Sequence, residues 1–294
     1  EGAFGVLSAC STIMPGKVAL VTGATGEIGR EIALGVARSG YTTLLTCRDE
    51  ARGKALVSAI AEGSGGGDVK LLVADLSSVA SMAAMVGALG EKYPGGLQLL
   101  VNNAAAMEQR KVLTGDGLEM QFGVNVQAYF SLMVLMAPLL VAGAKAGGAR
   151  VVNVASEYAG GLDLSDLQFE RRSYDVTSAY KASKQADRMI TATAATKLFP
   201  AGSGVDVNAC HPGVVTSKLL KGLGMQQGFH SAAQGAETPL LLATEPSLAG
   251  VTGRYFVSKK DTPCKFAGDA KACEALWKAC TAIHERVLGK KLEL

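Results

Sequence analysis

Tyr180 and Lys184 lie four positions apart in a stretch with a helical pattern, Tyr180-Lys181-Ala182-Ser183-Lys184. Side chains four apart on a helix share one face, so the ammonium can lie beside the phenol and favour its ionised form. A free phenol, with a pKa of about 10, is a poor base near neutrality, and a neighbouring cation corrects this. The spacing therefore indicates a tyrosine that exchanges protons with a substrate.

A glycine-rich turn follows the first apolar run of the chain. Gly23, Gly26 and Gly29 come after Val18-Ala19-Leu20-Val21-Thr22 and open a helical pattern near Ile28. Glycine lets a backbone approach a pyrophosphate closely, and a helix N-terminus offers free N–H groups. The pattern favours a dinucleotide site over a plain strand-to-helix turn. Together with the tyrosine, the lysine and Ser156, it describes a hydride-transfer site.

The second apolar strand ends in Thr46-Cys47-Arg48-Asp49, where such folds choose their cofactor. Arg48 could pair with a 2′-phosphate, so NADP(H) is favoured over NAD(H). Asp49 could instead accept bonds from the ribose, or could cap the next helix. Asp75-Leu76 and Asn102-Asn103-Ala104-Ala105, which follow the third and fourth strands, are placed for the adenine and for the ribose and nicotinamide, although turn chemistry alone would also explain them.

Strand-like and helical segments alternate through most of the chain, which predicts a parallel sheet covered by helices on both faces. We expect an α/β fold: a single doubly wound Rossmann domain over 17–294 with a seven-stranded parallel sheet, preceded by an extension at 1–16. The expected strands cover 17–22, 42–47, 69–74, 97–102, 149–155, 205–210 and 253–257. The expected helices cover 27–39, 49–62, 78–92, 117–145, 178–198, 236–244 and 269–288.

The composition excludes several classes of protein. The chain has 294 residues, is 48% hydrophobic and carries a formal charge of +3, too little to indicate nucleic-acid binding. Residues 254–294 hold nine Lys/Arg and five Asp/Glu, which fits a solvated face or a docking surface for a membrane or a large complex. The apolar run 132–144 is too short to span a bilayer and predicts a buried helix. The sequence also leaves open whether the protein forms a homo-oligomer.

The six cysteines lack metal-ligand spacing, so we expect no metal site. Reduced thiols are favoured over a disulfide from Cys264. The chain begins at Glu1, and residues 1–16 look like neither a secretory signal nor a basic presequence. Processing of an organelle precursor, with a plastid slightly favoured, would give such a start; a trimmed sequence of a cytoplasmic protein would too.

The combined motifs resemble the short-chain dehydrogenase/reductase family over nearly the whole chain. They are Thr22-Gly23-x-x-Gly26-x-x-Gly29, Asn102-Asn103-Ala104, Asn125, Ser156, Tyr180-x-x-x-Lys184 and Pro212-Gly213. The sequence is most similar to the retinol-dehydrogenase-like branch, which also contains chloroplast envelope and protochlorophyllide-reductase-like relatives. That finer match rests on Cys47-Arg48-Asp49, Phe122-Gly123-Val124-Asn125-Val126, the long interval between Ser156 and Tyr180, and His211-Pro212-Gly213-Val214-Val215-Thr216.

The resemblance implies a role for each matching residue. Tyr180 would exchange the proton, Lys184 would lower its pKa and hold the nicotinamide ribose, and Ser156 would hydrogen-bond the substrate oxygen. Asn125 would support a relay water near the lysine. The cofactor would also contact Thr22, Gly23, Thr25, Gly26, Ile28, Gly29, Arg48, Asp75, Leu76, Asn102, Ala104, Pro212, Gly213 and Thr216. Taken singly, the tyrosine and lysine could be an amphipathic pair, the serine a strand-end cap and the asparagine a satisfied core amide.

Glu27 departs from the family pattern, because compact members usually have glycine there. A carboxylate beside the pyrophosphate would be unfavourable unless it turns outward. The glycine spacing instead resembles extended, epimerase-like members, but no sugar-nucleotide domain follows the sheet.

Residues 215–235 fall where the family places a substrate-covering segment. Its leucine, methionine and phenylalanine side chains suit an elongated apolar substrate, although an unspecific cover fits as well. The insertion 159–177 could form a specificity wall or a solvated loop. We expect an NADP(H)-dependent oxidoreductase that acts on an apolar aldehyde, ketone or secondary alcohol. The alternative is a catalytically silent Rossmann subunit of a larger complex.

Overall fold

A single eight-stranded sheet forms the centre of the computed structural model, which describes residues 16–292. The strand order is β3-β2-β1-β4-β5-β6-β7-β8. The strands are β1 (Val18–Val21), β2 (Thr42–Cys47), β3 (Val69–Val73), β4 (Leu99–Asn102), β5 (Ala149–Val154), β6 (Val205–His211), β7 (Tyr255–Val257) and β8 (Lys260–Thr262). The predicted seven-stranded parallel sheet is confirmed for β1 to β7. The predicted extension lies outside the described residues except for Gly16.

The eighth strand, β8, was not predicted and runs antiparallel to β7. It is short and polar, and its first two residues are exposed, so it has no apolar alternation to recognise. The two residues of the hairpin turn, Ser258 and Lys259, both have positive φ, 48° and 66°. Such turns normally use asparagine or glycine, so the usual sequence signal is missing.

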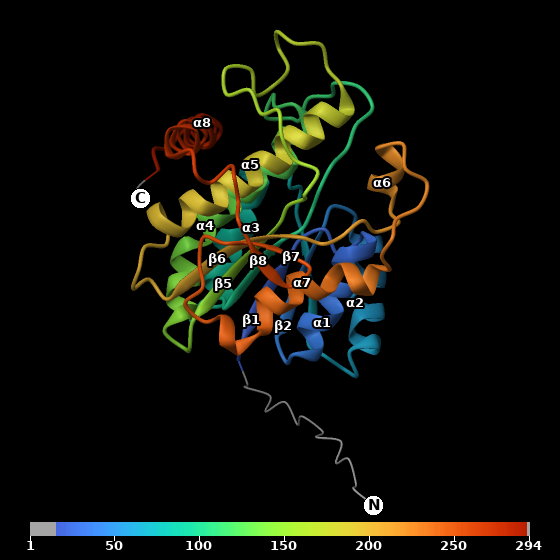
Figure 1. The fold of residues 1–294 in the computed structure, drawn as a ribbon. Helices are drawn as coiled ribbons and strands as arrows, with labels where there is room; N and C mark the ends of the chain where they lie inside the picture. The colour runs from blue at the N-terminus through green and yellow to red at the C-terminus, as the bar shows by residue number, and fades with distance from the viewer. Residues whose placement is uncertain (1–15, 293–294) are drawn as a thin grey trace, which may run out of the picture.

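Helices cover both faces of the sheet (Figure 1). On one face α1 (Glu27–Arg38) packs against α2 (Glu50–Gly63) and α7 (Ala232–Thr244). On the other, α4 (Ala128–Ala144) packs against α3 (Val79–Lys92) and α5 (Val176–Lys197), and α8 (Ala270–Leu288) lies against α3 and α5. The remaining helical segments are the π-helix η1 (Phe122–Gln127), the short α6 (Lys218–Gly222) and the 3-10 turn η2 (Pro246–Leu248).

The central strands carry apolar side chains on both faces of the sheet. All residues of β1 are buried, as are all residues of β4, because helices cover both faces of the parallel sheet. The continuous helix Phe122–Ala144 is long and apolar enough to cross a membrane by length and composition, but 67% of its apolar window is buried inside the protein. We therefore assign it to the core, as predicted for 132–144.

The five described cysteines carry free thiols, in agreement with the reduced state; Cys10 lies outside the described residues.

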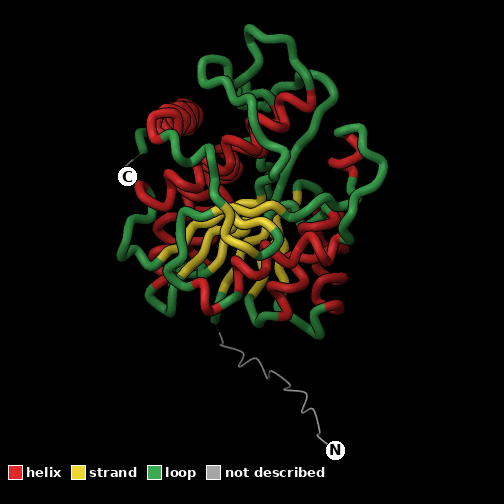
Figure 2. The backbone as a smooth tube through the Cα atoms, in the orientation of Figure 1, coloured by secondary structure: helices red, strands yellow, loops and turns green. Residues whose placement is uncertain are grey.

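The strand order reverses between β1 and β4, which lie side by side in the middle of the sheet. In open α/β sheets, ligands bind at such a switch point, beyond the carboxyl ends of the strands. Figure 2 shows long loops gathered at that edge, opposite the edge where the described chain begins. The loops after β1, β4, β5 and β6 converge there and build the candidate site.

Candidate active site

A pocket of about 1120 Å³ opens at the carboxyl edge of the sheet. Its lining comes from the loops after β1 to β6 and from parts of η1, α5 and α6. Most of the predicted site residues line it: Gly23, Thr25, Gly26, Ile28, Gly29, Arg48, Asp75, Leu76, Ala104, Ser156, Tyr180, Lys184, Pro212 and Gly213. The chain thus brings the glycine turn and the tyrosine–lysine pair into one cavity.

The three glycines of the turn have different reasons to be glycine. At Gly23, where φ is 68°, a Cβ would lie 2.6 Å from the Ala104 Cα, and at Gly29 it would collide with the Gly23 carbonyl oxygen. These two positions are fixed by packing within the protein. At Gly26 the nearest atom to an added Cβ is 3.5 Å away, so the protein itself leaves room there. Close approach by a ligand would explain the third glycine.

The N-terminus of α1 is prepared for an anion. Gly26 is its N-cap, no side chain caps the helix, and the first turn therefore presents free N–H groups. The other α-helices of the described chain that begin at a loop all have a side-chain cap, from Asp49, Ser78, Asp175, Ser217, Ser231 or Asp269. A pyrophosphate would satisfy the groups that a cap satisfies elsewhere, so these residues fit a dinucleotide.

Two polar residues hold the glycine turn against the loop after β4. Thr22 is completely buried, and its hydroxyl accepts from the backbone N–H groups of Asn103, at 2.9 Å, and Ala104, at 3.1 Å. The Asn103 side chain donates to the carbonyls of Thr22 and Gly23, at 3.1 and 3.3 Å. Thr22 was predicted as a cofactor contact, but it positions the turn from beneath.

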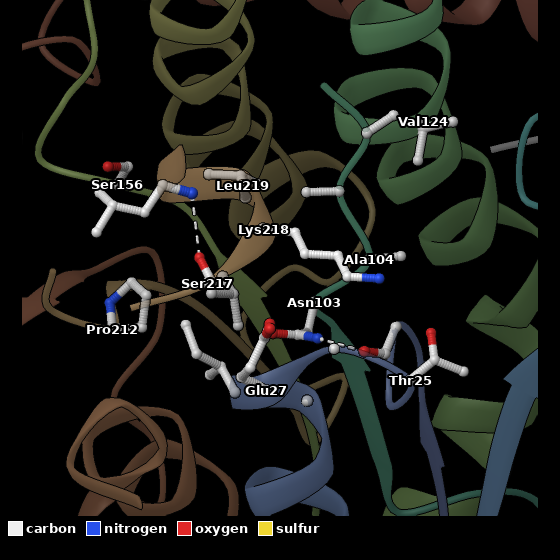
Figure 3. Close-up of a pocket in the computed structure, with 18 of the residues that line it drawn as sticks. Thr25, Glu27, Asn103, Ala104, Val124, Ser156, Pro212, Ser217, Lys218 and Leu219 are labelled. Carbon is white, nitrogen blue, oxygen red and sulfur yellow. Dashed lines mark hydrogen bonds between the residues drawn. The ribbon is translucent and has the colours of Figure 1, made fainter. Parts of the chain in front are cut away.

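Glu27 is the first residue of α1, is exposed, and lines the pocket. Figure 3 shows it directed into the pocket on the side of Asn103. The departure from the family pattern therefore places a carboxylate at the anion-binding end of the helix. A negative charge there stabilises α1 itself but opposes a bound pyrophosphate.

The residues at the end of β2 have separate tasks. Asp49 caps α2, with its Oδ1 accepting from the Arg52 N–H at 2.8 Å, which confirms the capping interpretation. Arg48 is exposed and lines the pocket, as does Arg52. Asp75 likewise makes a local turn, accepting from the Ser77 N–H at 2.9 Å, while it borders the pocket. The strongest cationic feature of this end of the pocket is therefore the arginine pair.

Tyr180, Ser156 and Lys184 meet where α5 passes the end of β5. Tyr180 and Ser156 are each 6% exposed and both line the pocket. The Ser156 Oγ accepts from the Tyr158 N–H at 3.0 Å, and its one hydrogen can be given either to the Tyr180 phenol, whose pKa it lowers, or to a substrate oxygen. The Lys184 Nζ lies 6.0 Å from the centre of the Tyr180 ring. The predicted face-sharing of the phenol and the ammonium is thus observed.

The charge environment of Tyr180 combines opposing effects. Burial raises the pKa of the phenol, while the Lys184 ammonium and the Ser156 hydroxyl lower it. Burial prevails, so the net pKa lies above the usual value for tyrosine. As predicted, Lys184 by itself lowers the pKa of Tyr180, but its effect is smaller than that of burial. The phenol nevertheless keeps its proton at neutral pH.

Four predicted residues lie outside the pocket lining: Thr22, described above, Asn102, Thr216 and Asn125. Asn102 is fully buried and donates from its side-chain amide to the Asn153 Oδ1 at 2.9 Å, within the sheet. Its neighbour Asn103 faces the pocket instead. Thr216 is exposed and its hydroxyl accepts from the Gly228 N–H at 2.9 Å, which ties together the two ends of the covering segment.

Asn125 is a buried connector in the π-helix η1. Its Oδ1 accepts from the Ala106 N–H at 2.7 Å, and its amide donates to the Ala106 carbonyl at 3.2 Å and to the Ser183 Oγ at 3.1 Å. It therefore links the loop after β4 to α5, one residue before Lys184. The side chain is a satisfied core amide, and its hydrogen bonds go to Ala106 and Ser183 rather than to the lysine.

The covering segment is partly helical. Ser217 caps α6, and the Gln109 side chain donates to the Gly222 carbonyl at 2.9 Å, which anchors the segment across the pocket. Its lining side chains are mainly apolar: Leu219, Leu220, Leu223 and Met225. Figure 3 shows Lys218 extending across the pocket toward Ala104. Sequence reasoning did not single out Lys218 as part of the site, whereas Asn103 belongs to the stretch 102–105 that was predicted near the ribose and nicotinamide.

The insertion 159–177 is an ordered loop. Asp166 accepts from the N–H groups of Glu170, Arg171 and Arg172. Burial would raise the pKa of Asp166, but these N–H donors and the Arg172 side chain lower it to about 2. None of residues 159–177, all of which the structure describes, lines the pocket. The loop therefore forms no wall of this pocket; it packs instead on residues 108–121, where Lys111 donates to the Phe169 carbonyl and Gln121 donates to the Tyr174 hydroxyl.

Comparison with known proteins agrees with this geometry. The family model for short chain dehydrogenase matches residues 17–228. The chain is 37% identical to polyprenol dehydrogenase of Mus musculus, covering 90% of this chain and 82% of that protein. It is 35% identical to retinol dehydrogenase 13 of Homo sapiens, covering 90% and 83%.

Solved structures show the same fold. An uncharacterized protein from Mycobacterium Paratuberculosis superposes with a TM-score of 0.74 at 26% identity, covering 95% of each chain. The Pseudomonas aeruginosa RhlG/NADP active-site complex superposes with a TM-score of 0.64 at 26% identity, covering 82% of this chain and 94% of that chain. Sequence, fold and site agree: this chain belongs to the short-chain dehydrogenase/reductase family and is an oxidoreductase of the kind that uses NAD(P)H.

Proposed function

We propose that the protein is an NADP(H)-dependent oxidoreductase that transfers hydride to or from an elongated apolar alcohol or carbonyl compound. The observation that carries the proposal is the single pocket in which Ser156, Tyr180 and Lys184 face an uncapped helix N-terminus and a leucine-rich cover. The named relatives support the substrate class, because they are dehydrogenases of polyprenol and retinol.

The preference for NADP(H) is supported by the end of β2. Arg48 and Arg52 present two guanidinium groups to the pocket, and the Asp49 carboxylate is engaged at the N-cap of α2. Guanidinium groups bind phosphate through paired hydrogen bonds, so this edge suits a 2′-phosphate better than a free ribose hydroxyl. The solved complex of a relative with NADP is consistent with this choice.

The side chains define the proton chemistry. The bound nicotinamide would supply or accept the hydride. Ser156 donates a hydrogen bond to the substrate oxygen, and Tyr180 exchanges a proton with that oxygen. Since burial raises the pKa of Tyr180, its proton is in place at neutral pH, which suits carbonyl reduction. Alcohol oxidation needs the deprotonated phenol, so its rate should rise with pH.

The test is turnover of retinal and of a long-chain polyprenal with NADPH, by the wild type and by Tyr180→Phe. The variant should lose at least about a hundredfold in kcat, because it removes the general acid, and should bind NADPH within about threefold of wild type. Glyceraldehyde serves as a polar control substrate and should be reduced poorly. Substantial turnover by the variant would refute the role of the tyrosine, and equal turnover of glyceraldehyde would refute the apolar substrate class.

A further inference from the structure

Lys184 forms a buried ion pair with Asp187, three residues further along α5. The Lys184 Nζ lies 2.8 Å from the Asp187 Oδ2, and the two side chains are 3% and 0% exposed. The same ammonium donates to the Val154 carbonyl of β5 at 3.0 Å. Two of its three N–H donors are thus committed to the protein, and one remains for the pocket.

The carboxylate is poorly compensated for a buried charge. Among the described residues, its Oδ1 has no hydrogen-bond partner. Burial of an ionised group is costly unless it is fully paired, and burial raises the pKa of Asp187 to about 7 despite the opposing effect of Lys184. Burial of this carboxylate costs free energy, and strongly perturbed groups beside a proposed catalytic residue often have a function there.

The other titratable groups that face the pair are neutral near pH 7. They are the phenols of Tyr129 on α4 and Tyr180 on α5, and the thiols of Cys210 on β6 and Cys280 on α8. Burial raises the pKa of each of them. Within the described chain, Lys184 and Asp187 are therefore the two charges that act on this part of the site.

These two charges act on Tyr180 in opposite directions. The ammonium lowers the pKa of the phenol and the carboxylate raises it. Seven residues, or about two helical turns, separate Tyr180 from Asp187, so the phenol, the ammonium and the carboxylate follow one face of α5. The phenol experiences the full effect of the ammonium only when the carboxyl group is protonated.

We propose that Asp187 is a positioning residue of the catalytic pair, which anchors the Lys184 ammonium against β5 and opposes its charge, and so sets how readily Tyr180 releases its proton. The proposal rests on the oxidoreductase function proposed above. An ionised Asp187 keeps the phenol protonated and favours reduction; a protonated Asp187 favours release of the phenolic proton and oxidation.

The test is the titration of the Tyr180 phenol in Asp187→Asn, followed by tyrosinate absorbance. The spectrum of each protein is corrected with that of the same protein carrying Tyr180→Phe, so the readout needs neither cofactor nor substrate. Asparagine keeps the shape and removes the charge, and the titration should move to lower pH by about one unit. The pH–rate curves for reduction and oxidation should move in the same direction by the same amount.

Asp175→Asn is the matched control. Asp175 is the exposed N-cap of the same helix, and asparagine caps equally well, so the same charge is removed without touching Lys184. Its Tyr180 titration should stay within about 0.2 unit of wild type, because exposed charges are screened. An unchanged or higher midpoint in Asp187→Asn would overturn the proposal, and so would an equal shift in the control.

If Asp187→Asn does not fold, as judged by circular dichroism, Lys184→Met and the double variant Lys184→Met/Asp187→Asn replace it. Without the ammonium, any charge that Asp187 keeps acts on the phenol directly, so Asp187→Asn should leave the Tyr180 midpoint unchanged or lower it in this background. A higher midpoint in the double variant than in Lys184→Met would overturn the proposal. The predicted phenol shift without turnover of any tested carbonyl would instead contradict the proposed function.

Discussion

Replacement of Glu27 by glutamine should tighten NADPH binding. Glu27 is the first residue of α1 and lines the pocket beside the uncapped N–H groups that would hold the pyrophosphate. Glutamine keeps the length and the helix propensity of the side chain, so the change removes the charge alone. The carboxylate and the pyrophosphate compete for the same positive end of the helix dipole.

The size of the effect follows from the distance and the salt. A phosphate one helical turn from the Glu27 carboxylate is separated from it by about 5.4 Å. Two phosphate charges at that distance repel the carboxylate by roughly 1.5 kcal/mol in water. With a Debye length of about 8 Å at physiological ionic strength, about 0.8 kcal/mol remains, or roughly fourfold in Kd. At about 0.01 M salt the repulsion is about 1.3 kcal/mol, roughly ninefold.

The assay is fluorescence titration with NADPH over a series of salt concentrations. Glu31→Gln is the control, since Glu31 lies one turn further along α1, away from the residues that line the pocket, and should change Kd less than twofold. Glu27→Gln should also lower the stability of the unliganded protein by about 0.3–1 kcal/mol, through the lost helix-dipole interaction. Unchanged or weaker binding, or a gain that does not depend on salt, would refute the reasoning.

Two further substitutions probe the edge and the base of the pocket. Arg48→Ala should weaken NADPH binding by about tenfold to a hundredfold, because a charged hydrogen bond to phosphate is worth about 1.5–3 kcal/mol, and should leave NADH binding within about twofold of wild type. Equal losses for both cofactors would refute the 2′-phosphate contact. Lys54→Ala, at an exposed residue of α2, is the control. Thr22→Val should lower the free energy of unfolding by about 2–4 kcal/mol in urea titrations, because it leaves the buried N–H groups of residues 103 and 104 without their acceptor. Thr43→Val removes a buried hydroxyl that donates to one carbonyl and should lower the free energy of unfolding by less. A similar loss in both variants would show that the two N–H groups held by Thr22 contribute nothing extra to stability.

The fold was predictable wherever local pattern and tertiary environment agree. The seven parallel strands are apolar because both faces of the sheet are covered, and each begins within about two residues of its predicted position. β8 was missed because it is polar and its turn uses Ser258 and Lys259 at positive φ, without glycine. The predicted helix at 117–145 contains a π-helical turn at Phe122–Gln127, for which the sequence offers no comparable signal.

Within the site, residue type was easier to predict than direction. Asn102 and Asn103 are adjacent, yet the first bonds to Asn153 within the sheet and the second reaches the pocket. Successive side chains at a strand end point to opposite faces, and which face meets the ligand depends on the exact residue at which the strand ends. Thr22 illustrates the same point, because its hydroxyl acts on the backbone of a loop that lies about 80 residues away in the chain.

Asp187 shows a different limit of sequence reasoning. A lysine and an aspartate three apart on a helix usually form an exposed pair of little consequence, because solvent screens both charges. The packing of α4, β6 and α8 around α5 removes that solvent, as the burial of Tyr129, Cys210 and Cys280 shows. The same two residue types at the same spacing then become a buried pair whose charges act on the Tyr180 phenol. The chemistry of the tyrosine therefore depends on helices that contribute no residue to the motif.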